Sequence, residues 1–169
     1  PCDSVQEAVA KIVGLYNQSS SSQNGKDTVV SSDKKKENKI NPKKQIQLQF
    51  NGSKITVTDS ITFLSDSNAG DIVVCGSHGG ASAGHYAQKL HLKAVFFNDA
   101  GIGKNNAGIQ SLDSLSDAGI LACTVDCMSA EIFNGHDTLE NGIITVCNQL
   151  AKNKNIKKGM SVKDAIMHF

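Results

Sequence analysis

Residues 71–99 read DIVVCGSHGGASAGHYAQKLHLKAVFFND, and this stretch decides the fold. A short apolar run at 72–75 ends in a glycine-rich turn, and a second apolar run follows at 94–97. Between them, apolar residues recur at helical spacing: Ala83, Tyr86, Ala87 and Leu90. Short continuous apolar runs are typical of strands buried on both faces, and a helix between two such runs indicates a parallel pair. The stretch therefore predicts a strand–helix–strand unit.

The same alternation continues toward the C-terminus. Ile109, Leu112 and Leu115 predict a helix that Gly119 ends, and 120–125 predicts a third buried strand. A long helical stripe is expected at Leu139, Ile143, Val146, Cys147 and Leu150. A last helix begins at Ser161, with Asp164 three residues later as in a helix N-cap. These elements predict an α/β fold: a three-layer α/β/α sandwich with a mainly parallel sheet, Rossmann-like or flavodoxin-like.

The N-terminal part divides into three segments. Residues 1–17 contain an amphipathic helix at about 5–16, and residues 18–44 form a Lys- and Ser-rich linker or insertion with few apolar residues. Residues 45–58 alternate polar and apolar on both sides of Asn51-Gly52, which predicts a β-hairpin. We therefore expect an α/β domain at 45–169. The chain starts and ends abruptly, as a fragment of a longer chain would.

The composition limits the class of protein. The 169 residues carry a formal net charge of +1 with 17 basic residues, all of them lysine. Seven lysines and three acids fall in 18–44, so this segment is basic and the remainder mildly acidic. With few aromatic residues and a near-neutral balance, we expect no nucleic-acid partner. No apolar run is long enough to span a membrane, residues 1–16 lack a secretory pattern, and the five cysteines suit reduced thiols in the cytoplasm.

Ligands of open α/β sheets bind beyond the carboxyl ends of the strands, and three loops fall there. The first follows the strand at 72–75 and is rich in glycine. His78 is its expected acid–base group, because imidazole titrates near neutral pH. The expected substrate-binding residues in this loop, with backbone N–H groups around two glycines holding an anion, are Gly76, Ser77, Gly79, Gly80 and Ser82.

The other two loops follow the second and third strands. Asp99 is expected to orient His78 or to act as a base, and Asp126 to complete the far wall of the site. The expected substrate-binding residues here are Asn98, Lys104 and Ser129, with Lys104 as the cation for an anionic group. In the structural alternative, the first loop is a plain turn with His78 as a cap, and Asp99 and Ser129 cap helices.

Three motif matches fail on their context. Residues 80–84 match G-x-S-x-G of serine hydrolases, but Ser82 lies several residues past the strand end. A His-Gly after a strand resembles caspase-like cysteine peptidases, but the next strand ends in Asn98-Asp99 and not in the required cysteine. Cys123 and Cys127 lack the second pair of a zinc site. The glycines fit neither a dinucleotide nor a phosphate-loop pattern. We expect no cofactor and no metal.

The convergence of three polar loops predicts a small-molecule enzyme. It would use acid–base chemistry of hydrolase, lyase or isomerase type on a small polar or anionic metabolite. The alternative is a ligand-binding or regulatory module without catalysis, or an accessory domain of a larger enzyme. A homo-oligomer is left open, and no membrane partner is expected.

Overall fold

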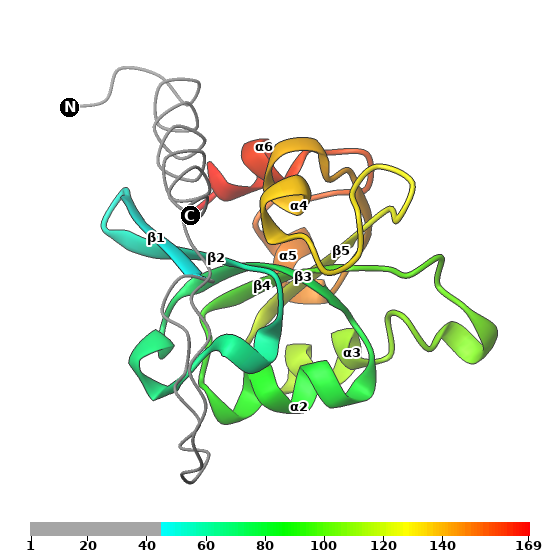
Figure 1. Ribbon diagram of the computed structural model, residues 1–169, viewed down its shortest axis with the longest axis horizontal. Helices are drawn as coiled ribbons and strands as arrows, with labels where there is room; N and C mark the ends of the chain where they lie inside the picture. Colours follow the sequence, from blue (N-terminus) through cyan, green and yellow to red (C-terminus); the bar gives the residue numbers. More distant parts are fainter. Residues whose placement is uncertain (1–44) are drawn as a thin grey trace, which may run out of the picture.

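The computed structural model describes residues 45–169 and shows a six-stranded mixed sheet with helices, an α/β architecture (Figure 1). The expected helix at 5–16 and the linker at 18–44 lie outside the described residues. The strands stand in the sheet in their order along the chain: β1 (Gln45–Phe50), β2 (Ser53–Thr58), β3 (Ile72–His78), β4 (Ala94–Asn98), β5 (Leu121–Val125) and β6 (Ile144–Cys147).

The predicted hairpin is confirmed. β1 and β2 pair antiparallel with Phe50 opposite Ser53, so the loop is the two residues Asn51 and Gly52. Both have positive φ, 47° and 75°, as the commonest two-residue hairpin turn requires. Ile55 and Val57 are buried in the core.

The centre of the sheet is parallel. β2, β3, β4 and β5 pair in parallel, and β6 returns antiparallel to β5. The antiparallel β5–β6 pair was not expected from the sequence. The order also has no reversal, so it differs from the Rossmann and flavodoxin orders, in which a reversal creates the ligand crevice.

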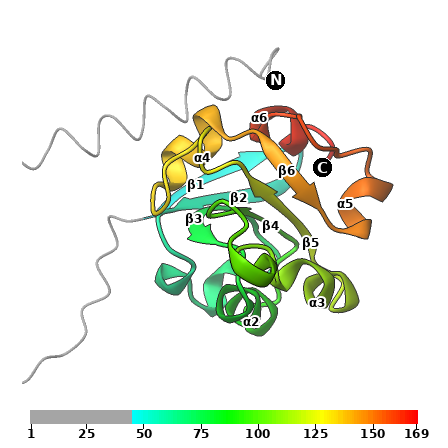
Figure 2. The ribbon, with the colours of Figure 1, turned by 90° about the vertical axis from the view of Figure 1, so that its right-hand side faces the viewer.

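Helices lie on both sides of this sheet (Figures 1 and 2). α2 (Ala81–Lys89) and α3 (Ser111–Asp117) lie on one side, beside a buried cluster that includes Val73, Val95 and Phe97. α4 (Gly135–Asn141) and α6 (Val162–Ile166) lie on the other side, beside a cluster that includes Val74 and Phe96. The alternation of strand residues between two apolar clusters explains the continuous apolar runs in the sequence.

Short 3₁₀ turns lie in two of the connections between strands. Two 3₁₀ turns, η3 (Ile61–Phe63) and η4 (Asp66–Asn68), join β2 to β3, and η5 (Lys104–Asn106) lies between β4 and α3. None of the helices within residues 45–169 is long and apolar enough to cross a membrane.

The expected long helix across 139–150 is wrong. The chain instead forms α4, then β6, then α5 (Gln149–Asn153). Gly142 ends α4, and the β-branched run Ile143 to Val146 packs better on a sheet than in a helix. The last helix is confirmed, since Ser161 Oγ accepts a hydrogen bond from the N–H of Asp164 at 3.1 Å.

Candidate functional site

The parallel strands bring the three predicted loops to one edge of the sheet. His78 at the end of β3 is in register with Asn98 of β4, and Asn98 is in register with Val125 of β5. The expected site residues that follow these strands therefore start from neighbouring positions. Their side chains nevertheless have different surroundings after each strand.

A hollow of about 220 Å³ opens at the end of β3. It is bounded by the last residues of β3, the first turns of α2, the η3 turn and the segment before α4. Four of the expected site residues line it: Gly76, Ser77, His78 and Ser82. Further lining residues that were not expected at a site include Ile61, Tyr86, Ile132 and Phe133.

His78 is exposed, and its ring is held by the backbone. Its Nδ1 accepts a hydrogen bond from the N–H of Gly80 at 3.2 Å. Nδ1 must therefore carry a lone pair, so in the neutral ring the proton is on Nε2. In this arrangement His78 offers a hydrogen-bond donor from Nε2.

Ser77 and Gly76 form the base of the hollow. Ser77 Oγ accepts a hydrogen bond from the N–H of Ile61 at 3.0 Å, which fixes the η3 turn beside β3. Gly76 is required by close packing, since a Cβ there would lie 2.2 Å from the backbone nitrogen of Asn134. The segment before α4 can approach β3 closely only because residue 76 has no side chain.

Phe133 forms a wall of the hollow in an unusual conformation. Its φ is +66°, a left-handed value that bulky residues rarely adopt, and its side chain is 56% exposed. The N–H of Phe133 donates to the carbonyl of Gly76 at 2.7 Å, and its ring meets Phe63 edge-on with centroids 6.0 Å apart. These contacts hold an exposed aromatic ring in place.

Asp137 anchors the same wall from behind. Its carboxylate accepts hydrogen bonds from the Asn141 side chain at 2.7 Å and from the N–H of Glu131 at 2.6 Å. These two hydrogen bonds, the Asn141 one first, lower the pKa of Asp137 below its ordinary value.

The two glycine N–H groups expected to hold an anion are already engaged. Gly79 N–H donates to the carbonyl of Asn98 at 3.0 Å, and Gly80 N–H donates to His78. Gly80 is the N-cap residue of α2, and no side chain caps the helix there.

Cys75 lies beneath the hollow, in the strand that leads to Ser77. It is fully buried, and burial raises its pKa to about 11. Cys75 is therefore a neutral thiol near pH 7 and not an activated nucleophile.

The polar residues after β4 serve the backbone. Asn98 is fully buried; its amide donates to the carbonyl of Ala130 at 2.9 Å and accepts from the N–H of Ala100 at 2.8 Å. Asp99 is 3% exposed, and its Oδ1 accepts from the N–H groups of Gly101 and Cys127 at 2.8 and 3.1 Å. Both side chains close loops.

The residues after β5 behave in the same way. Asp126 Oδ1 accepts from the N–H of Met128 at 2.9 Å. Ser129 Oγ donates to the carbonyl of Asp126 at 2.8 Å and accepts from the N–H of Ile143 at 2.9 Å. The expected substrate-binding role of Ser129 therefore competes with an internal role in joining β5 to the start of β6.

Asp99, Asp126 and Cys127 come together in one cluster. One ligand atom from each lies within 4.8 Å of the other two, an arrangement that could surround a metal ion. Two carboxylate oxygens and a thiolate would suit a borderline ion such as Zn²⁺. The cluster unites two of the three expected catalytic residues, but His78 belongs to the hollow at β3.

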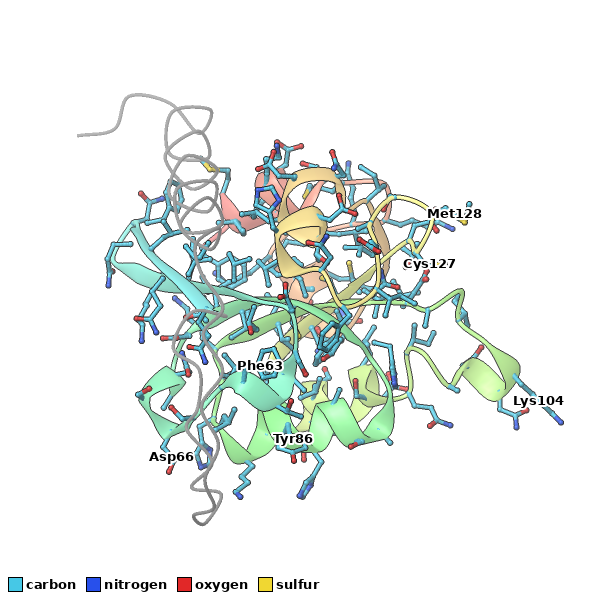
Figure 3. The ribbon with its side chains drawn as sticks, in the orientation of Figure 1. Phe63, Asp66, Tyr86, Lys104, Cys127 and Met128 are labelled. Carbon is cyan, nitrogen blue, oxygen red and sulfur yellow. The ribbon has the colours of Figure 1, made fainter. Side chains whose placement is uncertain are left out.

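Lys104 lies apart from both groups. It is exposed on η5, at the tip of a projecting loop and far from Tyr86 and Phe63 (Figure 3). The backbone around it has positive φ at four non-glycine residues: Ala100, Ile102, Asn105 and Asn106. In this structure Lys104 does not serve as the cation of the hollow.

Tyr86 lines the hollow, although the sequence pattern did not predict this. It was expected on the buried face of its helix, but it is 41% exposed. Ser82 and Tyr86 are four residues apart on α2, so both face the hollow. The spacing of Ser82 and Tyr86 was a usable signal, whereas nothing local marks Ile132 and Phe133.

No protein-family model, no curated protein and no solved structure matches this chain. The fold and the hollow define it only as an α/β protein with a small concave site at the end of β3.

Proposed function

We propose that the protein binds a small polar or anionic metabolite in the hollow at the end of β3 and acts on it by acid–base chemistry. The observation that carries this proposal is the position of His78: an exposed imidazole with Nδ1 fixed by Gly80, at the rim of a hollow of about 220 Å³. A neutral imidazole that presents Nε2–H can donate a hydrogen bond to a substrate oxygen and polarise it. To pass on a proton the ring must become the imidazolium, which requires Nδ1 to be protonated and its hydrogen bond from Gly80 to open.

The polar groups within a mainly apolar lining support an oxygen-rich or anionic ligand. Ser77 contributes a hydroxyl to the lining, and its Oγ accepts from the N–H of Ile61. The hydroxyls of Ser82 and Tyr86 and the first turn of α2 add donors. No Asp or Glu is among the residues that line this hollow. A donor-rich lining without a carboxylate favours an oxyanion or carbonyl over a cation.

Within this proposal, the acids after β4 and β5 position loops. One carboxylate oxygen of Asp99 accepts hydrogen bonds from two backbone N–H groups, and Asp126 accepts one from the N–H of Met128. We therefore propose His78 as the proton donor, with hydrolase, lyase or isomerase chemistry open. Tyr86 is the other titratable side chain that lines the hollow.

The second candidate is a ligand-binding module without catalysis. The observation that favours it is the separation of the expected catalytic set: His78 lines the hollow, Asp99 closes a loop and Lys104 projects elsewhere. A binding site needs only the donors and the apolar wall, so it is compatible with that separation.

Two further proposals concern the arrangement of the fold and the location of the protein. We propose that the elements form three layers, because buried clusters lie on both faces of the sheet. We also propose a reducing, cytoplasmic location, because the four cysteines of residues 45–169 are all free thiols.

A thermal-shift screen tests the proposal with small carboxylates, amides and phosphates. A ligand at 100 times its Kd should stabilise the native state by about 2.7 kcal/mol, which raises Tm. His78→Gln should weaken ligand affinity at least tenfold and so reduce this shift, whereas His85→Gln, at an exposed position of α2 outside the hollow, should leave the shift unchanged.

The outcomes separate the two candidates. Turnover of the bound ligand by the wild type, lost in His78→Gln, supports the enzyme. Binding that depends on His78 without turnover supports the module. A ligand that binds equally well to His78→Gln and to a Phe133→Ala variant would place the site elsewhere and overturn both.

A further inference from the structure

Cys123 and Cys147 face each other across the last two strands of the described sheet. They are register partners in the antiparallel β5–β6 pair, and the Cys123 thiol donates to Cys147 Sγ at an S–S distance of 3.4 Å. Both side chains belong to the buried cluster on the α4 and α6 side of the sheet. Cys127, which follows Cys123 in the sequence, lies instead beside Asp99 and Asp126.

The backbone around the pair fits a cross-strand disulfide. The N–H of Asn148 donates to the carbonyl of Ala122 at 2.9 Å, so the hydrogen bond lies beside the pair and not between its two members. In antiparallel strands, directly opposed residues that do not hydrogen-bond to each other have Cα atoms about 4.5 Å apart. That distance is within the range of natural disulfides, at its short end.

The two thiols are not equivalent. Cys123 is fully buried, whereas Cys147 is 6% exposed and is the outer member of the pair. The hydrogen bond from Cys123 and the charge of Lys152 hold the pKa of Cys147 below its ordinary value, although burial opposes them. Cys147 therefore has more thiolate character and better access, and Cys123 is placed behind it as a resolving thiol.

We propose that Cys123 and Cys147 form a reversible disulfide when the protein meets a hydroperoxide. The Cys147 thiolate attacks one peroxide oxygen, the O–O bond breaks, and hydroxide leaves, so that Cys147 becomes a sulfenic acid. Cys123 then attacks that sulfur, its thiol proton goes to the departing hydroxide, and water leaves. Two thiols and one hydrogen peroxide thus give one disulfide and two waters.

The bridge is suited to reduction as well as to formation. The rate of disulfide reduction depends on access to a sulfur, and Cys147 is the more accessible sulfur of the pair. An external dithiol would return both cysteines to thiols as it is itself oxidised. The bridge would tie β6, the last strand of the described sheet, to β5.

Peptide mapping of the full chain tests the proposal. Reduced protein is treated with hydrogen peroxide at a few equivalents, and free thiols are alkylated under denaturing conditions. Cleavage after lysine and glutamate yields fragments 105–131 and 141–152, with Cys123 and Cys127 in the first and Cys147 in the second. These two fragments should appear joined, with the loss of two hydrogens, and should separate after dithiothreitol treatment.

Variants assign the bridge to its two sulfurs. Cys127→Ser should keep the joined fragments, and Cys147→Ser should abolish them. In Cys123→Ser, the sulfenic acid at Cys147 should persist and be trapped by dimedone. Cys75→Ser is the control for loss of an unrelated buried thiol.

The wild-type map distinguishes the two possible bridges even where a variant fails to fold, because the alkyl group within fragment 105–131 marks the cysteine that is not in the bridge. Recovery of Cys123 and Cys147 as alkylated thiols after peroxide treatment would overturn the proposal. A bridge from Cys127 to Cys147 would overturn it as well.

Discussion

The end of β3 and the ends of β4 and β5 carry similar residues but use them differently. After β3, His78, Ser77 and Ser82 line a hollow. After β4 and β5, Asn98, Asp99 and Ser129 accept or donate hydrogen bonds within their own loops. Polar composition at a strand end is the same signal in both cases.

The difference comes from the backbone each loop must satisfy. The loop after β4 has left-handed residues between Ala100 and Asn106, so its N–H groups cannot pair as they do in a regular element. Asp99 and Asn98 supply the missing acceptors. After β3 the chain enters α2 directly, and fewer backbone groups need a side chain.

Replacement of Asn98 should have the largest effect among the residues that close the loops after β4 and β5. Asn98→Ala should lower the free energy of unfolding by about 3 kcal/mol, because it leaves a buried carbonyl and a backbone N–H without partners. His78→Ala, at an exposed position, should change it by less than about 0.5 kcal/mol. Urea denaturation of both variants measures the contrast, and equal effects would erase the distinction between the two regions.

Substitutions of Asp99 test whether its carboxylate closes a loop or takes part in the chemistry of the site. Asp99→Ala should cost about 2 kcal/mol of stability, because the N–H groups of Gly101 and Cys127 lose their acceptor. Asp99→Asn keeps an acceptor oxygen and should cost about half as much. Thermal unfolding of the pair checks this. An Asn variant that is fully stable but binds no ligand would show that Asp99 acts in the ligand site and does not merely close its loop.

Ser111 links the two regions. Its buried hydroxyl donates to the carbonyl of Gly79 at 2.7 Å, directly after His78. Ser111→Ala should cost about 1 kcal/mol, since the Ser111 backbone N–H still reaches the same carbonyl at 3.1 Å. Chemical denaturation gives the value, and Ser114→Ala on the same helix is the control. A loss above about 3 kcal/mol would show that the hollow is held as tightly as the closed loops.

The smallest effect concerns acid pH and the wall of the hollow. The pKa of Asp137 is lower in the folded protein than its ordinary value of 3.8. As the pH falls, the carboxylate is therefore protonated in the unfolded chain before it is protonated in the folded protein. The stability from Asp137 is therefore present above about pH 4 and is lost as the pH falls through the folded pKa.

Asp137→Asn checks this dependence. The stability difference between wild type and variant, measured by urea denaturation from pH 6 to pH 3, should shrink toward low pH. A difference that stays constant with pH would mean that the carboxylate does not anchor the segment that carries Phe133.

Much of the fold could be predicted from local patterns. The hairpin follows from alternation around Asn51-Gly52, and the apolar runs at 72–75 and 94–97 predict two strands. The glycine-rich loop was predicted to start at 76, but β3 continues through Gly76 and Ser77 to His78. The helix across 139–150 could not, because Ile143, Val146 and Cys147 fit a helical stripe and a strand equally well. Only pairing with β5 decides between them, and that contact lies far away in the sequence.

The sequence by itself determined which residues lie at or near the strand ends, because apolar runs are local features. Only the tertiary structure decided which of those residues face a ligand and which satisfy backbone. The same holds for Phe133 and Tyr86 around the hollow, and for the pairing of Cys123 with Cys147. The physical reason is that hydrogen-bond partners and exposure are set by residues distant in the chain, and a pattern along the chain does not record them.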